Sequence, residues 1–241
     1  MHYVGFVGTD FQTTPEAREI MNREFPAYDA EMSRRGVWLL GRELDYPHKA
    51  ATVRVRDGET LVSDGPFAET KEVVGGFDIL DCADLDEAIE VESKSPVAKF
   101  HPFEIRPFRE GPKMGGGAAA FAREDDAAGT PYLLAVWVSE TPTTPLDDPK
   151  LWRECEDWRQ KLEGTGAFVL GGALGGPETA TTLRFRDGKI QLADGPFLEI
   201  EEFIAGIDVV SCAERDQAIA LAGEHPFARY QTIEVRPFYS E

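Results

Sequence analysis

The stretch Asp64-Gly65-Pro66-Phe67 recurs as Asp194-Gly195-Pro196-Phe197, 130 residues further along the chain. The same offset aligns residues 54–58 with 184–188 and residues 104–108 with 234–238. Residues 36–108 align without a gap, and about thirty of some seventy positions are identical. The chain is therefore built from one structural unit used twice, and the question of fold reduces to a unit of about 110 residues.

The repeat divides the chain of 241 residues into two domains. We predict the first copy at residues 1–108 and the second copy at residues 131–241. Residues 109–130 lie between them and contain the run Gly-Gly-Gly-Ala-Ala-Ala. Low-complexity sequence of this kind predicts a flexible Gly/Ala-rich linker.

The composition, 42% hydrophobic and 29% charged, is that of a soluble globular protein. The net charge of −19 is spread over both repeats, and such a field repels nucleic acid and anionic membranes, so we expect neither as a partner. No apolar run approaches transmembrane length, and no signal peptide opens the chain. The 3 cysteines do not suggest a disulfide framework, so we expect a cytoplasmic location.

Each repeat reads as strand, helix, strand, hairpin, strand, helix and strand. In the first repeat, apolar runs at residues 2–8, 37–40, 73–80 and 103–106 predict strands, and residues 52–63 predict a hairpin that turns at Asp57-Gly58. This βαββαβ order with an added hairpin predicts an α+β fold with an antiparallel sheet and both helices on one face. We expect the two sheets to face each other as an intramolecular pseudo-dimer, with any pocket between them.

Residues 64–72, Asp-Gly-Pro-Phe-Ala-Glu-Thr-Lys-Glu, followed by Gly75-Gly76, resemble the signature of the YCII-related, or DGPF-domain, family. Residues 52–58 and 104–107 are also similar to the pattern of that family. The second repeat departs from it, because Glu201 replaces Lys71 and Ala205 replaces Gly75. A function that needs Lys71 is therefore not expected in the second repeat.

The resemblance implies a ferredoxin-like unit that dimerises into an α/β barrel. It also implies a biochemical role that is poorly defined across the family. Some relatives are proposed to act as enzymes on small organic acids or lactones through a His–Asp pair, with the histidine on the first helix. Others are thought to act alongside alternative sigma factors of the extracytoplasmic-function type.

The histidines of this chain do not match that pair. His2, His48, His101 and His225 all lie outside the first predicted helix of either repeat, and none aligns with a histidine in the other repeat. Phe25 and Cys155 occupy matching positions on the apolar face of those helices instead. We therefore predict no His–Asp dyad of the family type and interpret the isolated histidines as structural.

Carboxylates in and after the repeated loop are the first candidates for chemistry. Asp64 and Glu69 are candidate catalytic groups, because two converging carboxylates can share a proton or bind a cation. Asp194 and Glu199 are their counterparts in the second repeat and are candidate ligand-binding groups. The alternative is structural: an aspartate at a turn commonly binds its own downstream amides, and Phe67 can fill the core.

Arginines on the hairpin are the second set of candidates. Arg54 and Arg56 alternate along one strand, as Arg184 and Arg186 do in the second repeat. They are candidates for clamping a substrate carboxylate, but the acidic composition favours pairing with neighbouring acids across the sheet. The sequence has no paired Cys/His cluster, phosphate loop or dinucleotide fingerprint, so we expect no metal and no cofactor.

These observations favour a cytoplasmic tandem protein that binds a small ligand, such as an organic acid, or a protein partner. The rival hypothesis is a lyase, isomerase or hydrolase acting on a small acid or lactone, with Asp64 or Glu69 as general base and Arg54 as anion clamp. A third hypothesis, an accessory protein for a sigma factor, rests on the resemblance alone. The tandem is expected to be a monomer with an internal pseudo-dimer or a homo-oligomer.

Overall fold

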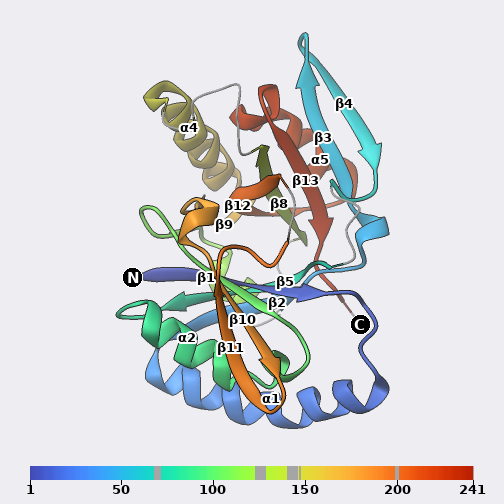
Figure 1. Cartoon of the computed structure of the whole chain (residues 1–241). Helices are drawn as coiled ribbons and strands as arrows, with labels where there is room; N and C mark the ends of the chain where they lie inside the picture. The colour runs from blue at the N-terminus through green and yellow to red at the C-terminus, as the bar shows by residue number, and fades with distance from the viewer. Residues whose placement is uncertain (68–71, 123–128, 140–145, 147, 199–200, 241) are drawn as a thin grey trace. The chain divides into compact units, whose positions relative to one another are not determined.

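The computed structural model describes residues 1–67, 72–122, 129–139, 146, 148–198 and 201–240. The chain forms two compact units (Figure 1). Unit 1 contains Met1–Glu43, Thr70–Gly111 and Gly175–Glu199, whereas unit 2 contains Leu44–Glu69, Pro112–Leu174 and Ile200–Glu241. Each unit is therefore assembled from segments of both repeats.

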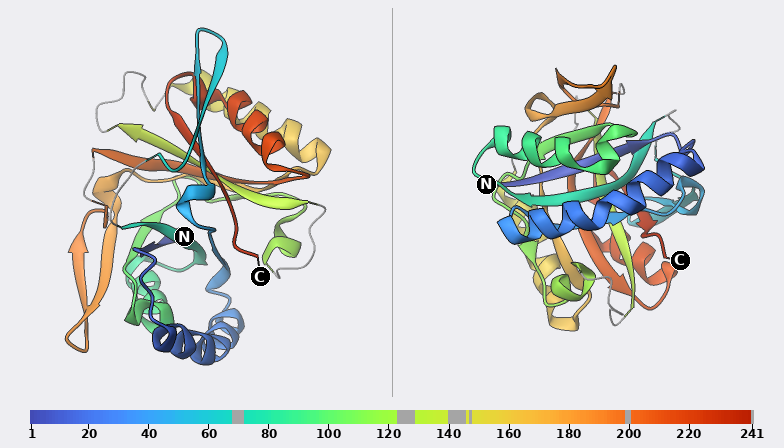
Figure 2. Two further views of the ribbon diagram at one scale, coloured as in Figure 1. Left: turned by 90° about the vertical axis from the view of Figure 1, so that its right-hand side faces the viewer. Right: turned by 90° about the horizontal axis from the view of Figure 1, so that it is seen from below.

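Unit 1 has a six-stranded antiparallel sheet in the order β11-β10-β6-β1-β5-β2. Its helices α1 (Pro15–Arg35) and α2 (Leu85–Lys94) lie side by side on one face of the sheet (Figure 2, right). The order β6-β1-β5-β2 is that of a ferredoxin-like unit, which confirms the predicted fold class. The strands are β1 (His2–Thr9), β2 (Trp38–Glu43), β5 (Val73–Asp81), β6 (Phe103–Pro107), β10 (Thr181–Arg186) and β11 (Lys189–Asp194).

Unit 2 repeats this arrangement with a seven-stranded antiparallel sheet in the order β4-β3-β13-β8-β12-β9-β7. Helices α4 (Pro149–Thr165) and α5 (Arg215–Glu224) pack on one face of it (Figure 2, left). The strands are β3 (Ala51–Arg56), β4 (Glu59–Asp64), β7 (Lys113–Met114), β8 (Thr130–Ser139), β9 (Phe168–Ala173), β12 (Glu202–Cys212) and β13 (Thr232–Pro237). Short helices are α3 (Ala118–Ala122) and the 3₁₀ turns η1 (Pro47–Lys49), η2 (Pro96–Lys99), η3 (Pro177–Thr179) and η4 (Pro226–Arg229).

Local sequence explains where the helices and turns of unit 1 begin and end. Thr14 caps α1 by accepting a hydrogen bond from the backbone N–H of Ala17, and Gly36 ends α1 at φ 71°. Asp84 caps α2 by accepting from the backbone N–H of Glu87 at 2.9 Å. Within the described ranges, no helix combines the length and apolar character needed to cross a membrane.

The predicted hairpin turns are both present. Asp57 and Gly58 have φ of 53° and 81°, and Asp187 and Gly188 have φ of 51° and 74°. Positive φ at both central residues is the conformation that an Asp-Gly pair adopts in a tight hairpin turn. The turns therefore confirm the sequence prediction.

Part of the predicted linker belongs to the sheet of unit 2. Lys113 and Met114 pair with Gly171 and Leu170 of β9. Gly115 follows at a close approach of two backbones, because a Cβ atom there would lie 2.3 Å from the Phe168 carbonyl oxygen. The glycines of this segment thus serve packing as well as chain reversal.

Each unit has its own hydrophobic core between its helices and its sheet. Met32, Leu80, Val91 and Ile105 are among the buried side chains of unit 1. Leu134, Leu162, Phe168 and Ile233 are among those of unit 2. Cys82 and Cys212 are both buried, as their matching positions predict.

The hairpins are exchanged between the repeats. Hairpin β3–β4 of the first repeat joins the sheet of unit 2, where Val53 pairs with Ile233 and Ala51 with Val235 of β13. Hairpin β10–β11 of the second repeat joins the sheet of unit 1, where Leu183 pairs with Phe103 of β6. The sequence predicts both hairpins but not this exchange.

A buried ion pair fastens each exchanged hairpin. Glu234 accepts a hydrogen bond from the backbone N–H of Phe67 at 3.0 Å and another from Arg236 Nε at 2.9 Å. In unit 1, Glu104 accepts from the backbone N–H of Phe197 at 3.2 Å and pairs with Arg106. The two repeated motifs therefore bind each other, the Glu-X-Arg of one repeat holding the Asp-Gly-Pro-Phe loop of the other.

We expect Glu234→Gln to lower the free energy of unfolding by about 1–3 kcal/mol, because a buried charged acceptor is lost beside Arg236 and Phe67. Asp64→Asn in the same loop is the matched control: Asp64 is 85% exposed, so its pair with Arg215 contributes less than about 1 kcal/mol. Urea denaturation of both variants measures the difference. Equal losses in the two variants would show that the buried glutamate does not fasten the loop.

Candidate functional site

Unit 2 contains a pocket of about 440 Å³ beside strand β3 of the exchanged hairpin. The wall nearest β3 carries Arg54 and Arg56, and Phe67 of the Asp-Gly-Pro-Phe loop also lines the pocket. The remaining lining residues come from the hairpin, β8, β12, η4 and the chain that leads from η4 into β13: Val55, Asp57, Trp137, Ser139, Glu202, Ala228, Arg229, Tyr230, Gln231 and Thr232. Residues of both repeats therefore form one pocket.

Arg54 is held in place by a hydroxyl group and an aromatic ring. Its Nε donates to Thr232 Oγ1 at 2.6 Å, and its guanidinium carbon lies 5.7 Å from the centre of the Phe67 ring. Phe67 in turn contacts Trp137, with ring centres 5.4 Å apart. These contacts fix the guanidinium plane but leave its terminal nitrogens without a partner among the described residues, so they can still bind an anion in the paired geometry that arginine favours.

The pocket combines positive charge with an apolar wall. The described lining residues include Arg54, Arg56 and Arg229 beside the acids Asp57 and Glu202, and Arg229 is paired with Glu154 outside this pocket. Trp137 is buried, and its Nε1 has no hydrogen-bond acceptor among the described residues. A small anion with an apolar part matches this combination.

The equivalent arginine of the other repeat is already occupied. In unit 1, Arg184 donates to both carboxylate oxygens of Glu72, at 2.9 and 2.8 Å. Pro102 and Val7 stand where unit 2 has Thr232 and Trp137. This pairing across the sheet is the structural alternative that the acidic composition favours, and it applies to Arg184 but not to Arg54.

Asp64 does not line the pocket. Asp64 is 85% exposed and pairs with Arg215 Nη2 at 2.8 Å, a partner from α5 that the sequence does not predict. Asp194 is exposed at the end of β11. Glu69 and Glu199 lie outside the described residues, so the catalytic role predicted for Asp64 and Glu69 stays a prediction.

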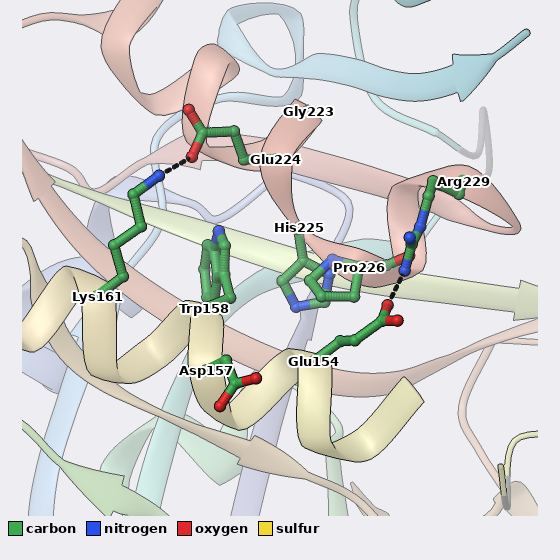
Figure 3. Close-up of a pocket in the computed structure, with 9 residues that line it drawn as sticks. All are labelled: Glu154, Asp157, Trp158, Lys161, Gly223, Glu224, His225, Pro226 and Arg229. Carbon is green, nitrogen blue, oxygen red and sulfur yellow. Dashed lines mark hydrogen bonds and ion pairs between the residues drawn. The ribbon is translucent and has the colours of Figure 1, made fainter. Parts of the chain in front are cut away.

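A second pocket of unit 2, of about 420 Å³, lies between α4 and the end of α5 (Figure 3). Lys161 and Glu224 pair at 2.6 Å on one side of it, and Arg229 pairs with Glu154 on the other. The buried His225 lies between them, and its ring centre is 4.7 Å from that of Trp158.

His225 belongs to a buried cluster that sequence reasoning missed. Its Nε2 lies 3.3 Å from Asp208 Oδ2, and Arg159 Nε donates to Asp208 Oδ1 at 2.8 Å. The other ring nitrogen, Nδ1, accepts from the backbone N–H of Phe227 at 3.2 Å. Nδ1 is hydrogen-bonded, whereas Nε2 lies at ion-pair distance from Asp208 without a hydrogen bond of good geometry. These buried contacts favour the structural interpretation of His225.

Asp208 is ionised in this cluster. Burial alone would raise the pKa of its carboxyl, but Arg159 and His225 together hold that pKa below the ordinary value. The sequence carries a signal for this residue, because Asp78 and Asp208 stand at matching positions inside two otherwise apolar strands. The sequence carries a similar signal for the pocket. At two positions that line it, the second repeat has Trp137 and Thr232 where the first repeat has Val7 and Pro102.

The sequence profile described as the YCII-related domain matches residues 1–110 and again residues 133–240. The chain therefore belongs to this family and contains two copies of its domain. A search of curated proteins finds an uncharacterised protein, R00369, of Rhizobium meliloti (strain 1021), which is 63% identical over 41 residues. That match spans 17% of this chain and 33% of the relative.

Two solved structures are similar to this chain at low sequence identity. A candidate chlorite dismutase, TA0507, has a TM-score of 0.40 and 9% identity, with 99% of this chain and 94% of that chain covered. An anthrone oxidase-like protein has a TM-score of 0.34 and 8% identity, with 99% and 92% covered. Both are too distant to bear on function.

We expect Asp208→Asn to lower the free energy of unfolding by about 3–5 kcal/mol near neutral pH, because Arg159 then stays buried without its carboxylate. The lowered pKa of Asp208 means that its contribution is present above about pH 4 and is lost as the pH falls further. Urea denaturation at several pH values should therefore show the two curves converging in acid.

Asp157→Asn is the matched control, since Asp157 is exposed on α4 beside the same pocket. It should change the free energy of unfolding by less than about 0.5 kcal/mol. A constant difference between the wild type and Asp208→Asn down to the most acid pH would contradict the ionised buried aspartate.

Proposed function

We propose that unit 2 binds a small organic anion in the pocket of Arg54, Arg56, Phe67 and Trp137. The single observation that carries the proposal is the contrast between two repeat-equivalent arginines. Arg184 is bound through two hydrogen bonds to Glu72, whereas Arg54 is held by a neutral hydroxyl and an aromatic ring. An arginine that is held in position, but is not paired with an acid, is ready to bind an anion from solution.

The lining of the pocket supports an aromatic or otherwise apolar body for this ligand. The Phe67 and Trp137 rings form one wall, and the indole N–H of Trp137 needs an acceptor. A carboxylate attached to a ring meets both requirements. Its two oxygens can accept hydrogen bonds from Arg54 and from the Trp137 indole, while its ring packs on the aromatic wall. We place this binding in the cytoplasm, where the buried thiols stay reduced.

The enzymatic alternative gains no support from the described residues. Asp64, which was predicted as a general base, faces solvent and is paired with Arg215. A base at near-neutral pH needs a less hydrated environment that raises the pKa of its carboxyl. The role of accessory protein for a sigma factor stays a prediction.

We expect wild-type protein to bind benzoate and Arg54→Ala to bind it about ten- to a hundredfold more weakly, because charge-assisted hydrogen bonds to the carboxylate are lost. Titration calorimetry with benzoate measures the affinity. Benzamide, a neutral molecule of the same shape, should bind as weakly to the wild type as benzoate binds to the variant.

Arg184→Ala is the matched control, because it removes the repeat-equivalent guanidinium in unit 1 and should leave benzoate affinity unchanged. Asp64→Asn should also leave it unchanged, since that side chain lies outside the pocket. Equal losses in Arg54→Ala and Arg184→Ala, or equal binding of benzoate and benzamide, would overturn the proposal.

A further inference from the structure

The aspartate position that is ion-paired with an arginine in unit 2 has different neighbours in unit 1. Asp208 of β12 is bound by Arg159 and His225. Asp78 occupies the matching position on β5, but the two positions that supply its partners hold Asp29 and Ser95. Neither of these residues is a cation, so Asp78 needs another source of stabilisation.

A second carboxyl group lies against Asp78 instead. Glu92 of α2 is fully buried, and its Oε1 lies over Gly5, the residue of β1 that pairs directly with Asp78 across the sheet. The two carboxyl groups are close enough for each to raise or lower the pKa of the other. Neither Glu92 oxygen accepts a hydrogen bond from a described N–H or O–H donor. Two carboxylates in contact without a cation repel each other strongly, so this arrangement requires a proton between them.

The backbone around the pair is shaped to hold it. A Cβ atom at Gly5 would lie 2.0 Å from Glu92 Oε1, and one at Gly41 would lie 1.9 Å from Asp78 Oδ1. In the second repeat, alanines replace both Gly5 and Glu92, at positions 135 and 222. Glycine at this β1 position and glutamate at this α2 position therefore occur together in unit 1, and both are replaced by alanine in unit 2.

Other polar groups surround the pair without neutralising it. Tyr28 of α1 is 6% exposed, and its hydroxyl has no described hydrogen-bond partner. The buried Nε1 of Trp38 on β2 lacks a hydrogen bond of good geometry, but the Trp38 side chain acts on Asp78 and lowers the pKa of its carboxyl, opposing part of the effect of burial. The charges of Glu92 and Asp78 act on the Tyr28 hydroxyl and, after burial, raise its pKa further.

The remaining titratable groups near the pair do not titrate with it. Arg35 of α1 acts on Tyr28 and Cys82 but is held by Glu87 and Glu90. Burial and the charges of Glu87 and Glu92 raise the pKa of Cys82 to about 12, so its thiol stays neutral. The pair is therefore the group in this part of unit 1 that changes charge near neutral pH.

We propose that Asp78 and Glu92 hold one proton between them in the folded protein, and that its release at alkaline pH loosens α2 from the sheet of unit 1. The shared proton lets one carboxyl donate to the other, which satisfies both buried groups. When the proton leaves, two negative charges remain in contact on β5 and α2, and their repulsion acts on the helix. Unit 2 lacks this switch, because Arg159 keeps Asp208 ionised and paired at neutral and alkaline pH.

The direction of the pH effect follows from the environment of each group. Burial raises the pKa of Asp78 to about 7 and that of Glu92 well above its ordinary range, and the charge of Asp78 raises Glu92 further. In the unfolded chain both carboxyls ionise at about pH 4. The stabilisation is therefore complete below about pH 4 and is lost as the pH rises toward 7 and beyond.

The test compares the wild type with Glu92→Gln, whose amide donates to Asp78 without needing a proton. Between about pH 5 and pH 7, the unfolding constant of the wild type should rise relative to that of Glu92→Gln by up to tenfold per pH unit. Carbon NMR of labelled carboxyl groups should show a protonated carboxyl at about pH 6 in the wild type that is missing from the variant. Hydrogen exchange, corrected for intrinsic rates, should show loss of protection in residues 85–94 at alkaline pH in the wild type alone.

Glu90→Gln on the same helix is the matched control, because Glu90 is ion-paired and its pKa is lowered to about 2 by Arg35 and Lys94. Its stability curve should parallel that of the wild type above about pH 5. If Glu92→Gln does not fold, the double variant Gly5→Ala/Glu92→Ala carries the residues of the second repeat and should show the same flattened curve.

Two results would overturn the proposal. One is a wild-type curve that stays parallel to that of Glu92→Gln across the neutral range, with no carboxyl titrating there. The other is stabilisation of the wild type by Ca²⁺ or Mg²⁺ at about pH 8 that Glu92→Gln abolishes, because a metal ion would then be the occupant of the site in place of the proton.

Discussion

The buried contact between the Glu-X-Arg segment of one repeat and the Asp-Gly-Pro-Phe loop of the other is the constraint on which the fold depends. A charged carboxylate taken out of water is stable only when its hydrogen bonds are complete, and Glu234 completes them with Phe67 and Arg236. The backbone N–H of Phe67 comes from the other repeat. The ion pair therefore fastens each hairpin to the sheet that it joins.

On this shared frame the two units have acquired different chemistry. In unit 1, Glu72 neutralises the hairpin arginine and a carboxyl pair occupies the core. In unit 2, the hairpin arginine stays available and the core aspartate is matched by Arg159. Each difference involves a few side chains at matching positions, so one backbone supports the proposed anion pocket in one unit and the proposed proton-sharing carboxyl pair in the other.

The repeat, the element order and the Asp-Gly turns could be predicted from the sequence because they depend on local periodicity and backbone preference. The exchange of hairpins could not, since β3 and β10 carry nearly the same residues and either would satisfy the same sheet edge. The repeated motif suggested a role for the Asp64 side chain. In the structure, the buried hydrogen bond of this motif is made by the backbone N–H of Phe67. Asp208 stands in an apolar strand, whereas Glu92 is one of several acids on α2. The groups around both side chains come from distant segments, so no local pattern predicts them.

Each sheet has an edge hairpin that comes from the other repeat. Every unit is therefore encoded by separated stretches from both halves of the sequence. Selection on the hairpin of the first repeat acts on the pocket of unit 2, while selection on its strand β6 and helix α2 acts on unit 1. The ancestral halves cannot be inherited apart without each losing part of its sheet. The two repeats therefore evolve together. A change that specialises one structural unit can arise in the sequence of either repeat.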